Sequence, residues 1–182
     1  MYGKRVIVFL CFFFFSFHFI FLNRAFSVDL SCVLARSVPS VFFEVSRELD
    51  IPVAWLVVIA YKESRLNPYA VNVNGKSYYF KNLMDAFLFL YGELYKEFSG
   101  RAKISYDIGL MQINRFWVER YNLSLFNLFH PAYNLRVGAM ILRYCLQKYG
   151  RQNVFACYHQ GRPGQEGKRY QREIVKLLRQ LR

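Results

Sequence analysis

The sequence predicts a compact, mostly α-helical domain with a small β-ribbon. Three observations lead to this fold class. Apolar residues recur at helical spacing in most segments beyond residue 40. The pair Asn74-Gly75, flanked by valines and aromatic residues, favours a tight hairpin turn. The length of 182 residues suits one ordinary domain with a sizeable core, with room for a leader.

Residues 1-27 have the pattern of an export signal. Two basic residues precede the apolar run Val6–Leu22, and small residues allow cleavage after Ser27. The run is close to the shortest length that spans a bilayer, so an uncleaved membrane anchor formed by residues 6-22 is the alternative. In either form, residues 28-182 are expected outside the cytoplasm, in the periplasm or cell envelope.

The chain is strongly basic, with a formal net charge of +13. Without residues 1-27 it keeps 22 basic and 12 acidic residues, so the exported part is still basic. An exported basic protein meets an anionic wall polymer or a membrane surface more often than nucleic acid. Nucleic acid is therefore not the expected partner.

The cysteines favour one disulfide and no metal site. Cys11 lies in the leader, which leaves Cys32, Cys145 and Cys157. An odd number permits one internal bridge, and the pair Cys145 and Cys157 is favoured because the two residues sit on consecutive predicted helices that fold back at Gly150. The histidines and cysteines lack the spacing of zinc ligands, so neither a metal nor a cofactor is expected.

Two helices are predicted after Pro39. Ser40–Leu49 has apolar residues on one face, as in a short amphipathic helix. Asp50 is expected to cap the next helix, with Pro52 in its first turn. That helix should run to about Ser64, and since it is apolar on several faces it is predicted to be the most buried one.

The hairpin is followed by a helix that Asn82 is expected to cap and that ends at Ser99-Gly100. Its stripe of large apolar side chains is expected to be a packing face, or else one wall of a cleft. The stripe consists of Leu83, Phe87, Leu90, Leu94 and Phe98.

The C-terminal part predicts further helices. An amphipathic run covers Phe116 to Tyr121, a long helix extends from His130-Pro131 to Gly150, and a short one covers Val154 to His159. A final helix follows a loop rich in glycine and proline. Its inward-facing residues are Tyr170, Ile174, Leu177, Leu178 and Leu181.

Glu63 is expected at the C-terminus of the buried helix, because Asn67-Pro68 favours ending it. The partial negative charge of the helix end and the apolar neighbours would raise the carboxyl pKa there. A general acid working near neutral pH requires such a pKa. Taken alone, the more ordinary interpretation is a solvated glutamate at a helix end.

Four separated segments together resemble the catalytic domain of soluble lytic transglycosylases (SLT type), which are relatives of goose-type lysozyme. They are Glu63-Ser64, Gly109-Leu110-Met111-Gln112, the segment of Asn134, and Ala156-Cys157-Tyr158-His159. The resemblance extends from about Cys32 to Ile174. It implies a lysozyme-like α+β fold with a substrate cleft, with residues 28-182 as the catalytic domain. Asn134 with Gly138 resembles the specialised members that open the wall for secretion, conjugation or pilus machines.

The resemblance also implies roles for single residues. Glu63 matches the family's one catalytic acid, and Ser64 matches the hydroxyl beside it. Gln112 matches a side chain that contacts the substrate sugar, next to a cleft floor formed by residues 109–111.

Near the C-terminus, Tyr158 matches a tyrosine that hydrogen-bonds near the glutamate, and Tyr170 with Ile174 resembles the final Tyr-x-x-x-Val of the domain. The chain departs from the family pattern at two places. His159 stands where the family has Asn, and the segment 76–105 is longer than the family minimum.

The implied activity is that of a peptidoglycan lytic transglycosylase acting on glycan strands. In this family the glutamate protonates the glycosidic oxygen of the MurNAc-GlcNAc bond, and the N-acetyl group captures the ring carbon. The 6-hydroxyl of the same sugar then closes a 1,6-anhydro ring. One carboxyl group suffices because the substrate supplies the nucleophile.

Two alternatives stay open. Asp107 would position a water molecule if the chain were a hydrolytic muramidase, although its more ordinary role is to accept backbone N–H groups before Gly109. His159 is the one feature that favours a non-catalytic, wall-binding scaffold subunit. Components of an envelope-spanning secretion or pilus machine are further expected partners.

Overall fold

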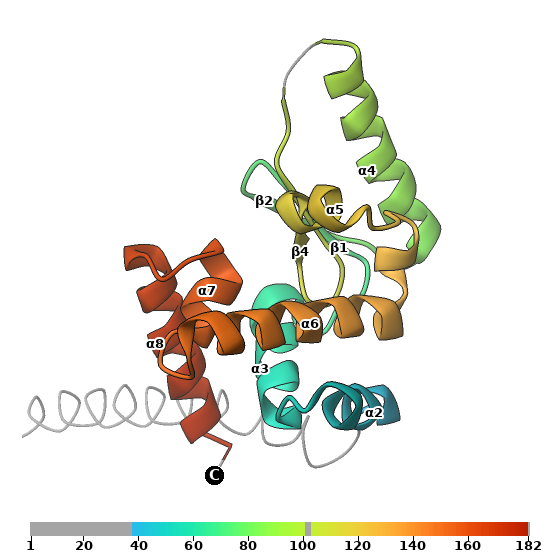
Figure 1. The fold of residues 1–182 in the computed structure, drawn as a ribbon. Helices are drawn as coiled ribbons and strands as arrows, with labels where there is room; N and C mark the ends of the chain where they lie inside the picture. Colours follow the sequence, from blue (N-terminus) through green and yellow to red (C-terminus); the bar gives the residue numbers. More distant parts are fainter. Residues whose placement is uncertain (1–37, 101–102, 182) are drawn as a thin grey trace, which may run out of the picture. The chain divides into compact units, whose positions relative to one another are not determined.

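The computed structural model describes residues 38–100 and 103–181. The predicted leader and residue Cys32 lie outside the described residues. The helices and strands are α2 (Ser40–Leu49), α3 (Val53–Ser64), β1 (Ala70–Val73), β2 (Lys76–Tyr79), α4 (Leu83–Phe98), β3 (Tyr106–Ile108), β4 (Ile113–Asn114), α5 (Arg115–Tyr121), η1 (Asn127–Phe129), α6 (Pro131–Tyr149), α7 (Val154–Gln160) and α8 (Gln165–Arg179) (Figure 1). Helices dominate this part of the chain, as predicted. Within it, no helix combines the length and the apolar character needed to cross a membrane.

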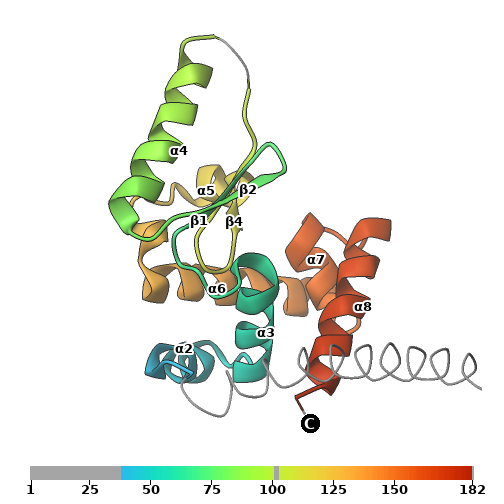
Figure 2. The same cartoon turned by 180° about the vertical axis from the view of Figure 1, so that it is seen from behind.

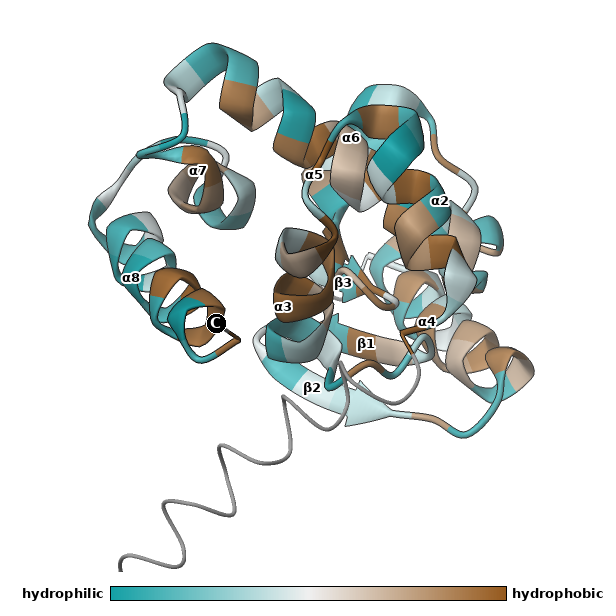
Figure 3. Cartoon of the chain, turned by 90° about the horizontal axis from the view of Figure 1, so that it is seen from below, coloured by the Kyte–Doolittle hydropathy of each residue, from teal (hydrophilic) through white to brown (hydrophobic). Residues whose placement is uncertain are grey.

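Helix α3 is buried over most of its length, as predicted, although the short helix α7 has a larger share of buried residues. Its residues from Trp55 to Ala60 are all buried. Figure 3 shows α3 as an almost continuous hydrophobic band. The helix ends where Arg65 turns into the left-handed region at φ 56°, so that Glu63 lies in its last turn.

The start of α3 differs from the prediction. Pro52 occupies the N-cap position, and Asp50 does not cap α3. Asp50 instead ends α2, with a left-handed φ of 52° and a backbone N–H that donates to Ser46 O. Aspartate tolerates the left-handed conformation better than most residues. Asp50 therefore ends α2 and does not start α3.

The predicted ribbon is part of a larger sheet. Asn74 (φ 50°) and Gly75 (φ 81°) form the expected hairpin turn between β1 and β2. However, the sheet has four antiparallel strands in the order β2-β1-β3-β4. Strands β3 and β4 have three and two residues, too few for an alternating pattern to be recognised in the sequence.

Helix α4 begins as predicted, because the Asn82 side chain accepts a hydrogen bond from the backbone N–H of Asp85. The expected packing face is only partly confirmed. Leu90 is buried together with Ala86, whereas Phe98 is exposed to solvent.

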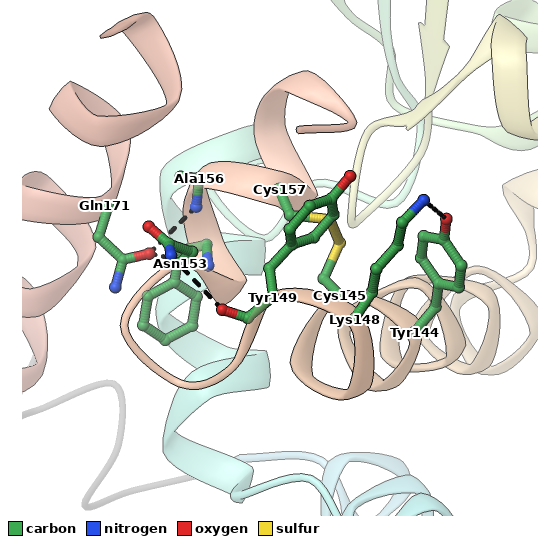
Figure 4. The surroundings of a disulfide bond; sticks show 9 residues. Tyr144, Cys145, Lys148, Tyr149, Asn153, Ala156, Cys157 and Gln171 are labelled. Carbon is green, nitrogen blue, oxygen red and sulfur yellow. Dashed lines mark hydrogen bonds between the residues drawn. A yellow bond between two sulfur atoms is a disulfide. The ribbon is translucent and has the colours of Figure 1, made fainter. Parts of the chain in front are cut away.

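The C-terminal helices are joined covalently. Cys145 in α6 and Cys157 in α7 form the predicted disulfide, with their Cα atoms 5.6 Å apart (Figure 4). Gln171 of α8 accepts hydrogen bonds from the backbone N–H groups of Phe155 and Ala156 at the start of α7. These contacts tie α7 to both neighbouring helices.

The turn between β3 and β4 is held by the buried side chain of Asn134 in α6. Its Oδ1 accepts from the backbone N–H of Met111 at 2.7 Å, and its Nδ2 donates to the carbonyl oxygens of Ile108 and Leu128 at 2.8 Å. Gly109 lies against this amide. Its φ is +79°, and a Cβ there would overlap Asn134 Nδ2 and lie 2.6 Å from Leu128 O.

Gly109→Ala is therefore expected to lower the free energy of unfolding by roughly 3 kcal/mol or more, through backbone strain and overlap with a fixed amide. Gly75→Ala is the matched control, because Gly75 has a similar φ of +81° and open space around its Cα. The Gly75→Ala variant should lose about 1 kcal/mol in the free energy of unfolding. Urea unfolding of both variants measures the difference, and equal losses would contradict the role of the Asn134 contact.

Candidate active site

Glu63 and Ser64 point in different directions at the end of α3. The Ser64 side chain is fully buried, and its hydroxyl donates to Ala60 O at 3.0 Å and lies 2.8 Å from Leu110 O. Ser64 therefore fastens α3 to the turn between β3 and β4. Glu63 instead lines a cavity, so only one of the two residues faces open space.

The cavity has a volume of about 320 Å³ and lies between the sheet, α3 and the C-terminal helices. Its lining is mainly polar. The lining residues are Glu63, Asn72, Ser77, Asp107, Gln112, Ile113, Asn114, Trp117, Ile141, Tyr158 and His159. Three of the predicted site residues besides Glu63 thus meet around one space, from elements far apart in the sequence.

The Glu63 carboxyl has a strongly raised pKa. Burial raises its pKa to about 7, the negative charge of Asp107 adds to this rise, and Lys62 opposes it. The Tyr170 hydroxyl donates a hydrogen bond to Glu63 Oε1 at 2.5 Å, which favours the carboxylate and lowers the pKa. Desolvation outweighs the hydrogen bond, so both protonation states are populated near neutral pH.

The resemblance implies a hydrogen bond near the glutamate for Tyr158 and places Tyr170 only in a terminal pattern. Tyr170, rather than Tyr158, is hydrogen-bonded to the glutamate. The Tyr158 hydroxyl donates to Met111 O at 2.7 Å and so ties α7 to the β3–β4 turn. Burial raises the pKa of both phenols well above the usual value, and both remain protonated donors.

His159 lies on top of the tyrosine that holds the glutamate. Its ring stacks on the Tyr170 ring, with centroids 4.5 Å apart and planes 2° from parallel. Burial lowers the pKa of the imidazole, which favours the neutral ring at neutral pH. His159 thus covers one face of Tyr170 while also lining the cavity.

The segment Gly109 to Gln112 is a tight turn beneath the cavity. Leu110 and Met111 are buried, and a Cβ at Gly138 of α6 would meet the Met111 side chain at 2.9 Å. Gln112 has a left-handed φ of 47°, and its Nε2 donates to Ala70 O and Gly109 O. Of this segment only Gln112 lines the cavity.

Asp107 is a second carboxyl group in the same cavity. Burial raises its pKa, against a hydrogen bond of 2.7 Å from Asn114 Nδ2. The sequence predicts backbone donors for this residue, but the donor found is the Asn114 side chain. The Asn114 amide lies beside Asp107 because the two residues are paired across strands β3 and β4. The sequence did not predict this register.

The sequence did not identify several of the residues that line the cavity. They are Asn72, Ser77, Ile113, Asn114, Trp117 and Ile141. Asn72 and Ser77 face each other across the hairpin, and Asn72 Nδ2 lies 3.2 Å from Ser77 Oγ. Asn72 and Ser77 could have been identified in the sequence as polar residues at paired positions of the predicted hairpin.

The arrangement suits proton transfer. Within the described residues, no group of three or more histidine, cysteine or acidic side chains is placed to hold a metal ion. A carboxyl group with a pKa of about 7, fixed by a phenol and facing a polar cavity, can give up a proton and take one back at neutral pH.

Comparison with known protein families gives one match: the transglycosylase SLT domain, over residues 40–174. The matched range contains α2 to α7 and most of α8, with every residue that lines the cavity. Searches of curated proteins and of solved structures gave no significant match.

Glu63→Gln is expected to stabilise the fold at alkaline pH. The folded-state pKa of about 7 exceeds the ordinary 4.5, so the native state binds the proton more tightly and its stability falls as pH rises through this window. Above pH 7 the variant should gain about 1 to 3 kcal/mol in the free energy of unfolding. Urea unfolding at pH 4 and pH 8 tests this, and a gain that does not grow with pH would contradict it.

Proposed function

The chain belongs to the transglycosylase SLT family and is a peptidoglycan lytic transglycosylase, and we propose that Glu63 is its single catalytic acid and base. We further propose that it cleaves the β-1,4 bond between MurNAc and GlcNAc and forms 1,6-anhydro-MurNAc. The observation that carries this proposal is the raised pKa of Glu63, hydrogen-bonded by Tyr170 and facing a polar cavity.

In the first step the protonated Glu63 gives its proton to the glycosidic oxygen as the bond from that oxygen to C1 of MurNAc breaks. The carbonyl oxygen of the N-acetyl group bonds to C1 and carries the positive charge that develops. Glu63 is then a carboxylate, and the Tyr170 hydroxyl stabilises that charge. The step needs no second carboxyl group as nucleophile.

In the second step the Glu63 carboxylate takes the proton from the 6-hydroxyl of the same sugar. The O6 atom bonds to C1, and the bond between C1 and the acetamido oxygen breaks. No water is consumed, and Glu63 returns to its protonated form. A pKa near neutrality suits both steps, because neither protonation state is strongly disfavoured.

The remaining site residues support the acid or the sugar. Gln112 offers its side-chain carbonyl to the sugar, since its nitrogen is occupied by the turn. His159 offers an imidazole edge where the family has an amide. Ser64 and Tyr158 position the turn beneath the substrate through their hydrogen bonds to Leu110 O and Met111 O, and Tyr158 also lines the cavity.

Asp107 supports the second candidate, a hydrolytic muramidase. It lines the same cavity as Glu63 and is fixed by Asn114, as a group that positions a water molecule would need to be. For the transglycosylase we assign it another effect: its negative charge adds to the rise in the pKa of Glu63 that burial causes, which favours the protonated acid.

We also propose where the enzyme works. The basic composition and the export pattern of residues 1-27 support a location of residues 28-182 in the periplasm or cell envelope, either released or anchored by residues 6-22. Local opening of the wall for a secretion, pilus or conjugation apparatus would suit a transglycosylase of this small size.

Digestion of purified sacculi by the full-length protein in detergent tests the reaction. Mass spectrometry should detect muropeptides ending in 1,6-anhydro-MurNAc, each lighter by one water than the hydrolysis product. Reducing-end products in their place would establish the muramidase. Glu63→Gln should lose at least a thousandfold in rate while remaining folded, and retained turnover would refute its role.

Two substitutions should move the pH profile of kcat/KM in opposite directions. Activity should fall as pH rises above about 7, where Glu63 loses its proton. Tyr170→Phe removes a hydrogen bond to the carboxylate and should shift this limb to higher pH. Asp107→Asn removes a neighbouring negative charge and should shift it to lower pH. Shifts in the same direction would contradict the assigned electrostatics.

A further inference from the structure

Helix α4 carries an exposed apolar stripe on the side opposite its packed face. The stripe consists of Met84, Leu88, Tyr91, Tyr95 and Phe98, which are 53%, 58%, 58%, 64% and 90% exposed. Ala86 and Leu90, on the other side, are buried. Figures 1 and 2 show α4 extending away from the sheet.

The spacing of the stripe is that of a helix pair. Its members are separated by four, three, four and three residues, the alternation that forms the contact seam of a coiled coil. With about 200 Å² for each fully exposed side chain, the exposed fractions correspond to roughly 650 Å² on one copy. That is about four-fifths of the ~800 Å² that each partner contributes to a standard interface, and slightly above the ~600 Å² at the upper end for the largest apolar patch of a typical monomer.

A glycine lies beside the centre of the stripe. Gly92 is in the middle of α4 and is exposed, where glycine costs about 1 kcal/mol relative to alanine. A Cβ at this position would meet nothing within 4 Å, so nothing in the described part of the chain requires glycine there. The missing side chain leaves a hollow next to Leu88, Tyr91 and Tyr95, into which a large side chain of another helix fits.

The stripe is complementary to itself in an antiparallel pair. When a two-fold axis passes between positions 91 and 92, Tyr91 of each copy lies over Gly92 of the other, and Leu88 lies opposite Tyr95. Asp85 and Lys96 flank the stripe on the side of Gly92. The same axis brings Asp85 of one copy near Lys96 of the second copy, twice by symmetry, so that Lys96, which pairs with Glu93 in its own helix, gains a second acidic partner.

We propose that two copies of this chain associate through α4 as an antiparallel, two-fold symmetric helix pair centred between Tyr91 and Gly92. The proposal is independent of the catalytic assignment, since α4 contributes no residue to the cavity. The occupant of the stripe is the second copy because the area, the hollow and the paired charges all match when the helix meets itself.

Sedimentation velocity of the full-length protein in detergent micelles tests the proposal. The wild type should show a concentration-dependent dimer, and Leu88→Lys should weaken dimerisation at least a hundredfold without changing thermal unfolding or activity. All variants share residues 1–37, so association through that segment would be the same in each. A monomeric wild type at ~100 μM, or an unaffected Leu88→Lys variant, would overturn the proposal.

Charge exchange tests the antiparallel geometry. Asp85→Lys and Lys96→Asp should each raise the dimer Kd about tenfold by opposing like charges, and the double variant should restore it. Failure of the double variant to recover would overturn the antiparallel pairing. Binding of a monomeric wild type to anionic vesicles, lost in Leu88→Lys, would assign the stripe to a membrane surface and also overturn the proposal.

Discussion

The hydrogen bond from Tyr170 to Glu63 is the interaction on which the site depends. It joins the last helix to the central one across 107 residues of sequence, and it holds the carboxyl group where burial raises its pKa. A buried carboxylate without a donor would be costly, and a solvated one would be too acidic to act as a general acid near neutral pH. The Tyr170 hydrogen bond lowers the pKa of Glu63, but by less than burial raises it.

The rest of the fold fixes the two partners of that hydrogen bond. Ser64 fastens the end of α3 to the turn between β3 and β4, and Asn134 of α6 fixes the same turn through hydrogen bonds with Met111 and Ile108. Tyr158 reaches the turn from α7. The turn that resembles a substrate-binding motif is therefore also the structural junction of the domain, which explains why most of its side chains are buried.

Local features were predictable from the sequence, and features that depend on long-range pairing were not. The buried helix, its end at Glu63 and the Asn74-Gly75 hairpin follow from apolar spacing and turn chemistry. The short strand β3 forms by pairing with β1, and β4 forms by pairing with β3. The environment of Glu63 likewise requires α8 and β3, so its sequence context alone left an ordinary helix-end acid as the better interpretation.

The resemblance to a family supplied the set of site residues, and the structure shows that some of them make contacts other than those expected. It identified Tyr170 only as part of a terminal pattern, whereas the structure brings its hydroxyl to Glu63 and stacks His159 on its ring. NMR titration of the Glu63 side-chain carboxyl carbon in the full-length protein is the most direct test of this account. A pKa of about 7 is predicted, and a value near the ordinary 4.5 would contradict it.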